Sequence, residues 1–86
     1  MPEISRFYGI IIKMYFSDHN PPHFHVEYNE YKAEVEIDTL NIKSGEIPKR
    51  VYLLVLEWAI NHKDELKRNW ELTKSNQQPI KIDPLD

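Results

Sequence analysis

Three of the four histidines of this chain lie within seven residues, in the stretch SDHNPPHFHVEY that runs from Ser17 to Tyr28. Imidazole exchanges protons near neutral pH, and it is also the most common side-chain ligand of transition metals. Asp18 comes directly before the first of these histidines, and two prolines separate His19 from His23. The stretch therefore indicates a metal site, a proton-transfer site or the polar side of an ordinary hairpin.

Two runs of alternating polar and apolar residues, 23–28 and 31–38, predict a pair of β-strands. Only Asn29 and Glu30 separate the runs, so we expect a hairpin with a two-residue loop. The apolar members of both runs should face the core: Phe24, Val26, Tyr28, Tyr31, Ala33, Val35 and Ile37. His23 and His25 would then lie together on the opposite, polar face.

This hairpin register places each of these two histidines opposite a carboxylate, with His25 facing Glu34 and His23 facing Glu36. A histidine held by a carboxylate is oriented and kept basic, as proton transfer requires. A ribonuclease that uses no metal would also need a second acid or base and a cation for the phosphate. The predicted catalytic residues are His19, His23, His25 and Glu34, and the predicted binding residues are Arg6, Lys13, Tyr15 and Asp18, provided that the first strand adjoins the hairpin.

The same stretch could instead hold a metal ion through His23, His25 and Asp18, with His19 as a further ligand. Imidazole and carboxylate suit zinc and other first-row divalent ions. The third alternative is a solvated hairpin face, where exposed histidine–glutamate pairs contribute little to stability. No cofactor is expected apart from the metal alternative, because the chain has no glycine-rich phosphate loop.

The N-terminal half of the chain is expected to supply the strands that position these residues. Residues 4–16 are rich in β-branched and aromatic side chains and predict a strand with a bend or bulge at Gly9. Residues 17–22 contain aspartate, asparagine and two prolines and predict a turn. A further short strand is expected near 40–43, ending at Ser44 and Gly45.

The second half reads as helix and begins at Pro48, which suits the first turn of a helix. Apolar residues then recur at spacings of three and four: Val51, Leu54, Val55, Trp58, Ala59, Leu66 and Trp70. A single helix of about 26 residues is unusual in a small domain, so two helices broken near 61–64 are favoured over one. Ile80 and Ile82 are candidates for an edge strand. The predicted fold class is α+β, with an antiparallel sheet of about four strands packed by one or two C-terminal helices.

Length and composition limit the number of domains and the kinds of binding partner to be expected. With 86 residues, one small core and a single domain covering 1–86 are expected. The formal net charge of −3 gives no overall basic field of the kind that attracts nucleic acid. The absence of cysteine excludes thiolate metal sites and favours a reducing cytoplasm. The longest apolar run, 10–12, is far too short to cross a membrane, so no membrane contact is expected.

The stretch MPEISRFYGIIIKMYFSDHNPPHFHVEY, followed later by VLEWAINHKDELKRNWEL, resembles a family of short bacterial proteins. This family is catalogued as domain of unknown function number 4160. Its pattern maps here onto Arg6, Phe7, Gly9, Asp18, His19, Pro21, Pro22, His23, Phe24, His25, Tyr28, Glu57, Trp58 and Trp70. The resemblance covers nearly the whole chain and carries over no established activity.

The resemblance does imply a partner. Members of this family tend to be encoded beside a second small family, domain of unknown function number 2442, in pairs that look like toxin–antitoxin modules. A small cognate protein docked through an exposed sheet edge or the histidine-rich face is the expected partner. The alternatives are a toxin that contacts or cuts RNA with the histidine-rich hairpin, and a metal-binding protein.

Overall fold

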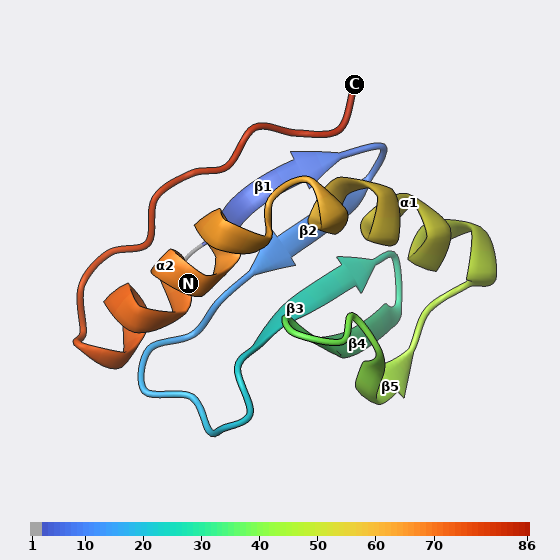
Figure 1. Ribbon diagram of the computed structural model, residues 1–86. Coiled ribbons are helices and arrows are strands. Elements are labelled where there is room, and N and C mark those ends of the chain that lie inside the picture. The colour runs from blue at the N-terminus through green and yellow to red at the C-terminus, as the bar shows by residue number, and fades with distance from the viewer. Residues whose placement is uncertain (1–2) are drawn as a thin grey trace.

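The computed structural model describes residues 3–86 and shows a five-stranded sheet followed by two helices. The strands are β1 (Glu3–Phe7), β2 (Ile10–Lys13), β3 (His23–Tyr28), β4 (Tyr31–Glu36) and β5 (Ile42–Glu46). The helices α1 (Lys49–Ile60) and α2 (Lys63–Lys74) lie over one face of the sheet (Figure 1). Every strand pairs antiparallel with the next one along the chain, in the order β1-β2-β3-β4-β5. The α+β fold is confirmed, with five strands in place of about four.

The fifth strand arises because the first predicted strand is a hairpin. Tyr8 and Gly9 have φ angles of 52° and 77°, so both lie in the left-handed region that tight two-residue hairpin loops require. Phe7 therefore pairs with Ile10, and β1 folds back on β2. The predicted bend at Gly9 is a complete reversal of the chain.

The β3–β4 hairpin has the expected register, and all six of its residue pairs are confirmed, from His23–Glu36 to Tyr28–Tyr31. Its apolar side faces the helices, and Phe24, Val26 and Val35 on that side are fully buried. The core continues into β1 and β2 and into both helices. Met1 and Pro2, which open the stretch quoted above, lie outside the described residues.

The two helices meet at a short break, which confirms the favoured alternative. α1 ends at Ile60, and the side-chain amide of Asn61 donates to the carbonyl oxygen of Glu57. α2 then begins with Asp64 and Glu65 in its first turn, where carboxylates interact favourably with the helix dipole. Within residues 3–86, no helix is long and apolar enough to cross a membrane.

The tail after α2 packs against the domain without forming the expected edge strand. Its backbone meets β1 through one hydrogen bond, from the Ile82 N–H to the Ile4 carbonyl oxygen at 2.8 Å. Asn69 of α2 is buried and exchanges two hydrogen bonds of 2.8 Å with the backbone of Ile80. The Trp58 indole N–H donates to the carbonyl oxygen of Asp83. The tail is therefore held by side chains of the helices, and Ile82 is buried while Ile80 is exposed.

Candidate histidine–aspartate site

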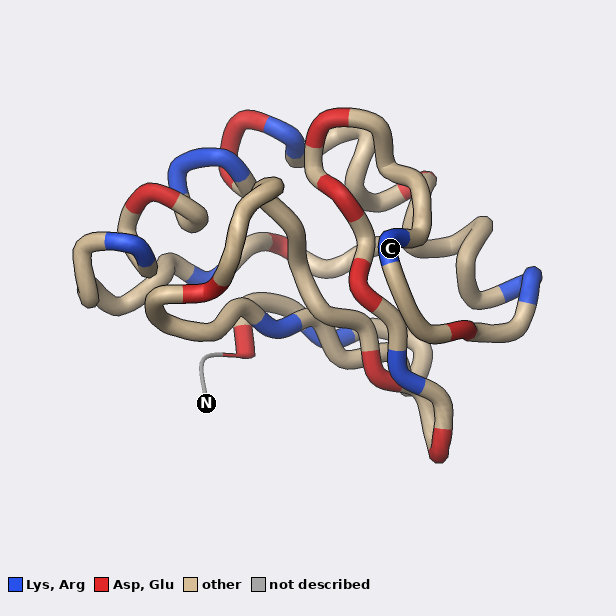
Figure 2. Tube along the Cα trace, turned by 90° about the horizontal axis from the view of Figure 1, so that it is seen from below, with Lys and Arg blue, Asp and Glu red and all other residues tan. Residues whose placement is uncertain are grey.

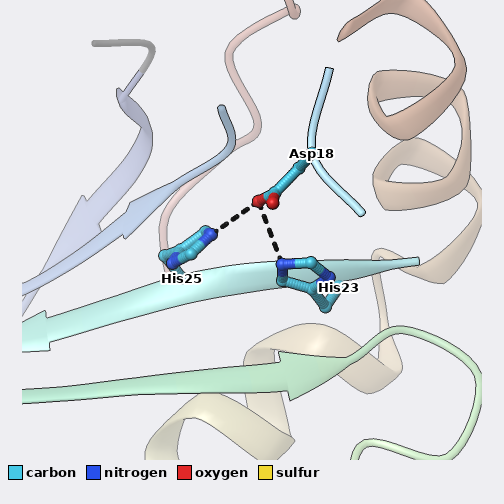
Figure 3. Close-up of side chains that lie close together, drawn as sticks. All are labelled: Asp18, His23 and His25. Atoms are coloured by element: carbon cyan, nitrogen blue, oxygen red, sulfur yellow. Dashed lines mark hydrogen bonds and ion pairs between the residues drawn. The ribbon is translucent and has the colours of Figure 1, made fainter. Parts of the chain in front are cut away.

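The site forms where the loop between β2 and β3 folds back over the start of β3. His23 and His25 are the first and third residues of β3, so their side chains leave the strand on the same side. Asp18 comes from the loop, and Figure 3 shows its carboxylate between the two imidazole rings. The loop itself is tied to α2, because the N–H of Ser17 donates to the carbonyl oxygen of Thr73.

One carboxylate oxygen serves both histidines. Asp18 Oδ2 lies 2.9 Å from Nε2 of His25 and 3.0 Å from Nε2 of His23. The other oxygen, Oδ1, accepts a hydrogen bond of 3.0 Å from the backbone N–H of His19. The ligand atoms of Asp18, His23 and His25 all lie within 4.8 Å of one another, a spacing that could hold a metal ion.

His23 is buried, with 2% of its side chain exposed. Its ring packs on the indole of Trp70, 5.3 Å between centroids, and its Nδ1 lies 2.8 Å from the carbonyl oxygen of Pro21. The alternative of a solvated hairpin face therefore does not hold at His23. The loop and α2 close over the first residue of β3, which the alternation within β3 does not reveal.

The carboxylate partner of His23 also differs from the one expected. Glu36 stands opposite His23 in the ladder, as predicted, but its carboxylate accepts a hydrogen bond from Thr39. The carboxylate oxygens near His23 Nε2 belong to Asp18 and, at 3.6 Å, to Glu34. Glu34 faces His25 in the ladder and is therefore part of the site as predicted.

Residues 9–71 match the family model described as Domain of unknown function (DUF4160). The chain belongs to this family. The matched segment contains the whole histidine–aspartate site and Trp70, whereas the tail after α2 lies outside it. Comparison with curated proteins and with solved structures finds no match.

The predicted binding residues of this DUF4160 chain are only partly brought to the site. Lys13 stands opposite His25 in the sheet, and the Tyr15 ring meets the His25 ring edge-on at 4.4 Å. Lys13 is paired with Glu27, its Nζ 3.2 Å from Oε2. Arg6 is bound to Glu3 and is largely exposed, so its guanidinium is directed to that carboxylate.

His19 contributes to the DUF4160 site through its backbone. Its side chain is exposed, and its imidazole is outside the group formed by Asp18, His23 and His25. A cavity of about 250 Å³ lies beside His25, and its other lining residues include Tyr15, Glu34, Ser44 and Gly45. The sequence indicated a short strand near Ser44 and Gly45 but not its place beside His25, which follows from the order of the strands.

The pKa of the Asp18 carboxyl differs clearly from its ordinary value. Burial alone would raise the pKa of its carboxyl, but this is outweighed by the hydrogen bond from His25, the bond from the His19 N–H and the charge of the two imidazoles. The pKa of Asp18 therefore lies below its ordinary value. The folded chain thus binds the Asp18 proton less tightly than the unfolded chain does.

This direction predicts how acid affects the metal-free DUF4160 chain. The Asp18 carboxylate contributes stability that is fully present above an ordinary aspartate pKa of about 3.9 and is lost as the pH falls through the lowered pKa. In chelator, wild type should therefore be more stable than Asp18→Asn at pH 7, and the difference should shrink below about pH 4. Urea unfolding of both proteins from pH 7 to 2 measures it. A difference that grows on acidification would contradict the assigned role of Asp18.

Proposed function

We propose that this chain is one component of a two-protein module of the toxin–antitoxin type. It binds a small cognate protein of the family catalogued as domain of unknown function number 2442. The binding surface is the face of the sheet opposite the helices, together with the free edge at β5. The main support for the proposal is the mixed charge of that face, where lysine and arginine side chains lie beside glutamates. We place the module in the cytoplasm, because a chain without cysteine forms no disulfides and so suits a reducing compartment.

Three of the cations near this face lie beside carboxylates. Arg6 pairs with Glu3 at 2.8 Å, Lys13 with Glu27 at 3.2 Å, and Lys43 with Glu34 at 3.4 Å. Figure 2 shows positive and negative residues occurring together along the chain trace. Nucleic acid binding depends on cations that are free to neutralise phosphates, and the formal net charge here is −3. A face of mixed charge instead suits a protein that carries the complementary arrangement.

The β5 edge offers a second means of attachment. All five residues of β5 are exposed, and the strand pairs with β4 on one side. An edge strand presents unpaired N–H and C=O groups to which a partner can add a strand of its own. The opposite edge, β1, is partly occupied because its Ile4 carbonyl oxygen accepts from the tail. Ile42 adds an exposed apolar side chain to the free edge.

This proposal is tested with two matched substitutions of exposed isoleucines. Ile42→Lys places a charge on the β5 edge and is expected to weaken the cognate partner's affinity at least tenfold. Ile60→Lys makes the same change on α1, where 64% of the side chain is exposed, and should leave affinity unchanged. Calorimetric titration of each variant with the separately purified partner gives the two affinities. Equal affinities for the two variants would place the interface elsewhere.

A second candidate is a ribonuclease that uses no metal, and it rests on the contact between Asp18 and His25. This pair, with Tyr15 against the ring, borders a cavity of about 250 Å³. An imidazole held in this way is suited to proton transfer. Lys13 would have to leave Glu27 to bind a phosphate. Growth arrest that is lost with His25→Ala but kept with His19→Ala would favour this candidate over simple docking.

A further inference from the structure

We infer that Asp18, His23 and His25 bind a divalent first-row transition metal ion such as zinc. The site is formed by the β2–β3 loop and the first half of β3, at the border of the proposed docking face, and all three ligands come from this chain. The inference rests on hydrogen positions, on spacing and on the choice of donor atoms.

The hydrogen on His23 is fixed by its surroundings. Nδ1 lies 2.8 Å from the carbonyl oxygen of Pro21, and since a carbonyl oxygen only accepts, Nδ1 must carry the hydrogen. In the neutral ring, Nε2 then carries a lone pair. Asp18 Oδ2, which is also only an acceptor, lies 3.0 Å from this Nε2.

Two acceptor atoms at this distance repel each other, so a positive charge is needed between them. In the metal-free chain a second proton on His23 can supply it, at the cost of an imidazolium that is 98% buried and shares one carboxylate oxygen with His25. A buried charge is costly unless it is fully paired. A divalent cation removes the repulsion and satisfies all three donor atoms at once.

The spacing of the donor atoms fits such an ion. Bonds of about 2.1 Å to a tetrahedral zinc ion place neighbouring donors about 3.4 Å apart, a few tenths of an ångström more than the two separations found around Asp18 Oδ2. The two separations from Asp18 Oδ2 are 2.9 and 3.0 Å. Histidines that bind metal through Nε2 commonly donate the Nδ1 hydrogen to a backbone carbonyl, which holds the ring in place. His23 makes this contact with Pro21.

The donor set and its surroundings indicate an open site. Two imidazoles and one carboxylate suit zinc and its first-row neighbours, and three protein ligands leave a position for water or a small ligand. Glu34 Oε1 lies 3.6 Å from His23 Nε2, where it can accept a hydrogen bond from a metal-bound water. The cavity lined by Tyr15, His25 and Glu34 gives that position room.

The experiment is a calorimetric titration of the tag-free, chelator-stripped chain with zinc chloride. One zinc ion per chain is expected to bind, and the melting temperature should rise with zinc and return with chelator, because the ion binds the folded state. Absence of binding by the wild-type chain would overturn the inference and leave a buried ion pair as the description of the site.

Substitutions locate the ion. Asp18→Asn and His25→Ala should each lower zinc affinity by at least about 100-fold, more than the loss of an outer-shell contact usually costs. His19→Ala is the matched control, since its exposed ring belongs to the same loop but not to the site, and its affinity should equal wild type. His23→Ala removes a buried ring and can unfold the chain, so Asp18→Asn, which keeps the side-chain shape, decides the outcome. Unchanged affinity in Asp18→Asn, or an equal loss in His19→Ala, would overturn the assignment.

Discussion

Replacing Trp58 by alanine is expected to lower the free energy of unfolding by about 3–5 kcal/mol, as large-to-small changes in a core do. Its side chain is fully buried, in the last turn of α1. Its ring packs against Phe7, Phe24 and His62, with centroids 5.4, 6.0 and 5.5 Å away. Its indole N–H also holds the tail through the carbonyl oxygen of Asp83. Urea unfolding followed by circular dichroism gives the value.

Two further variants separate the causes of this loss. Leu53→Ala changes an exposed residue of the same helix and should alter stability by less than about 0.5 kcal/mol. Trp58→Phe keeps most of the apolar contact and removes the hydrogen bond to Asp83, so its loss should be intermediate. If the free energies of unfolding of Trp58→Ala and Leu53→Ala lie within 1 kcal/mol of each other, the indole does not hold the sheet and α1 together.

Gly45→Ala should also destabilise the chain severely, by about 2 kcal/mol or more. Gly45 has a φ of 80°, in the left-handed region, although it lies within β5. An added Cβ would stand 2.3 Å from the Lys32 carbonyl oxygen and 2.9 Å from the Ala33 Cα, and backbone atoms of β4 cannot give way cheaply. The variant should lose part of the pairing between β4 and β5.

Ser44→Ala provides the control for Gly45→Ala, because Ser44 is the neighbouring exposed residue of the same strand. Its melting temperature should stay near that of wild type. Amide hydrogen exchange of β4 and β5 then tests the mechanism, and faster exchange confined to these strands is expected for Gly45→Ala. Wild-type exchange and stability in that variant would show that the strand tolerates a side chain at this position.

The sequence was informative wherever local pattern decides structure. The two-residue loop at Asn29 and Glu30 set the register of the β3–β4 hairpin, and that register placed His25 opposite Glu34. The break between the helices followed from the length of the apolar pattern. β5 was placed at 40–43 instead of Ile42–Glu46 because it has no alternation of its own. Its course depends on pairing with β4, and Leu40 instead turns into the core with a φ of 63°.

The sequence predicted which residues form the site better than it predicted how they are buried. Asp18, His23 and His25 were recognisable as one group, but the closing of the loop depends on α2, far along the chain. The Thr73 carbonyl holds Ser17, and Trp70 covers His23. Asn69 had a usable signal, since a polar residue on the buried side of α2 must find hydrogen-bond partners, which it does on the tail backbone.

The most direct test of the metal assignment is a crystal structure of the zinc-loaded chain with anomalous diffraction data on both sides of the zinc absorption edge. The account predicts one anomalous peak between Nε2 of His23, Nε2 of His25 and a carboxylate oxygen of Asp18, about 2.0–2.2 Å from each. The Nδ1 of His23 should still donate to the Pro21 carbonyl oxygen. A peak at His19 or His62 alone, or no peak beside Asp18, would contradict it.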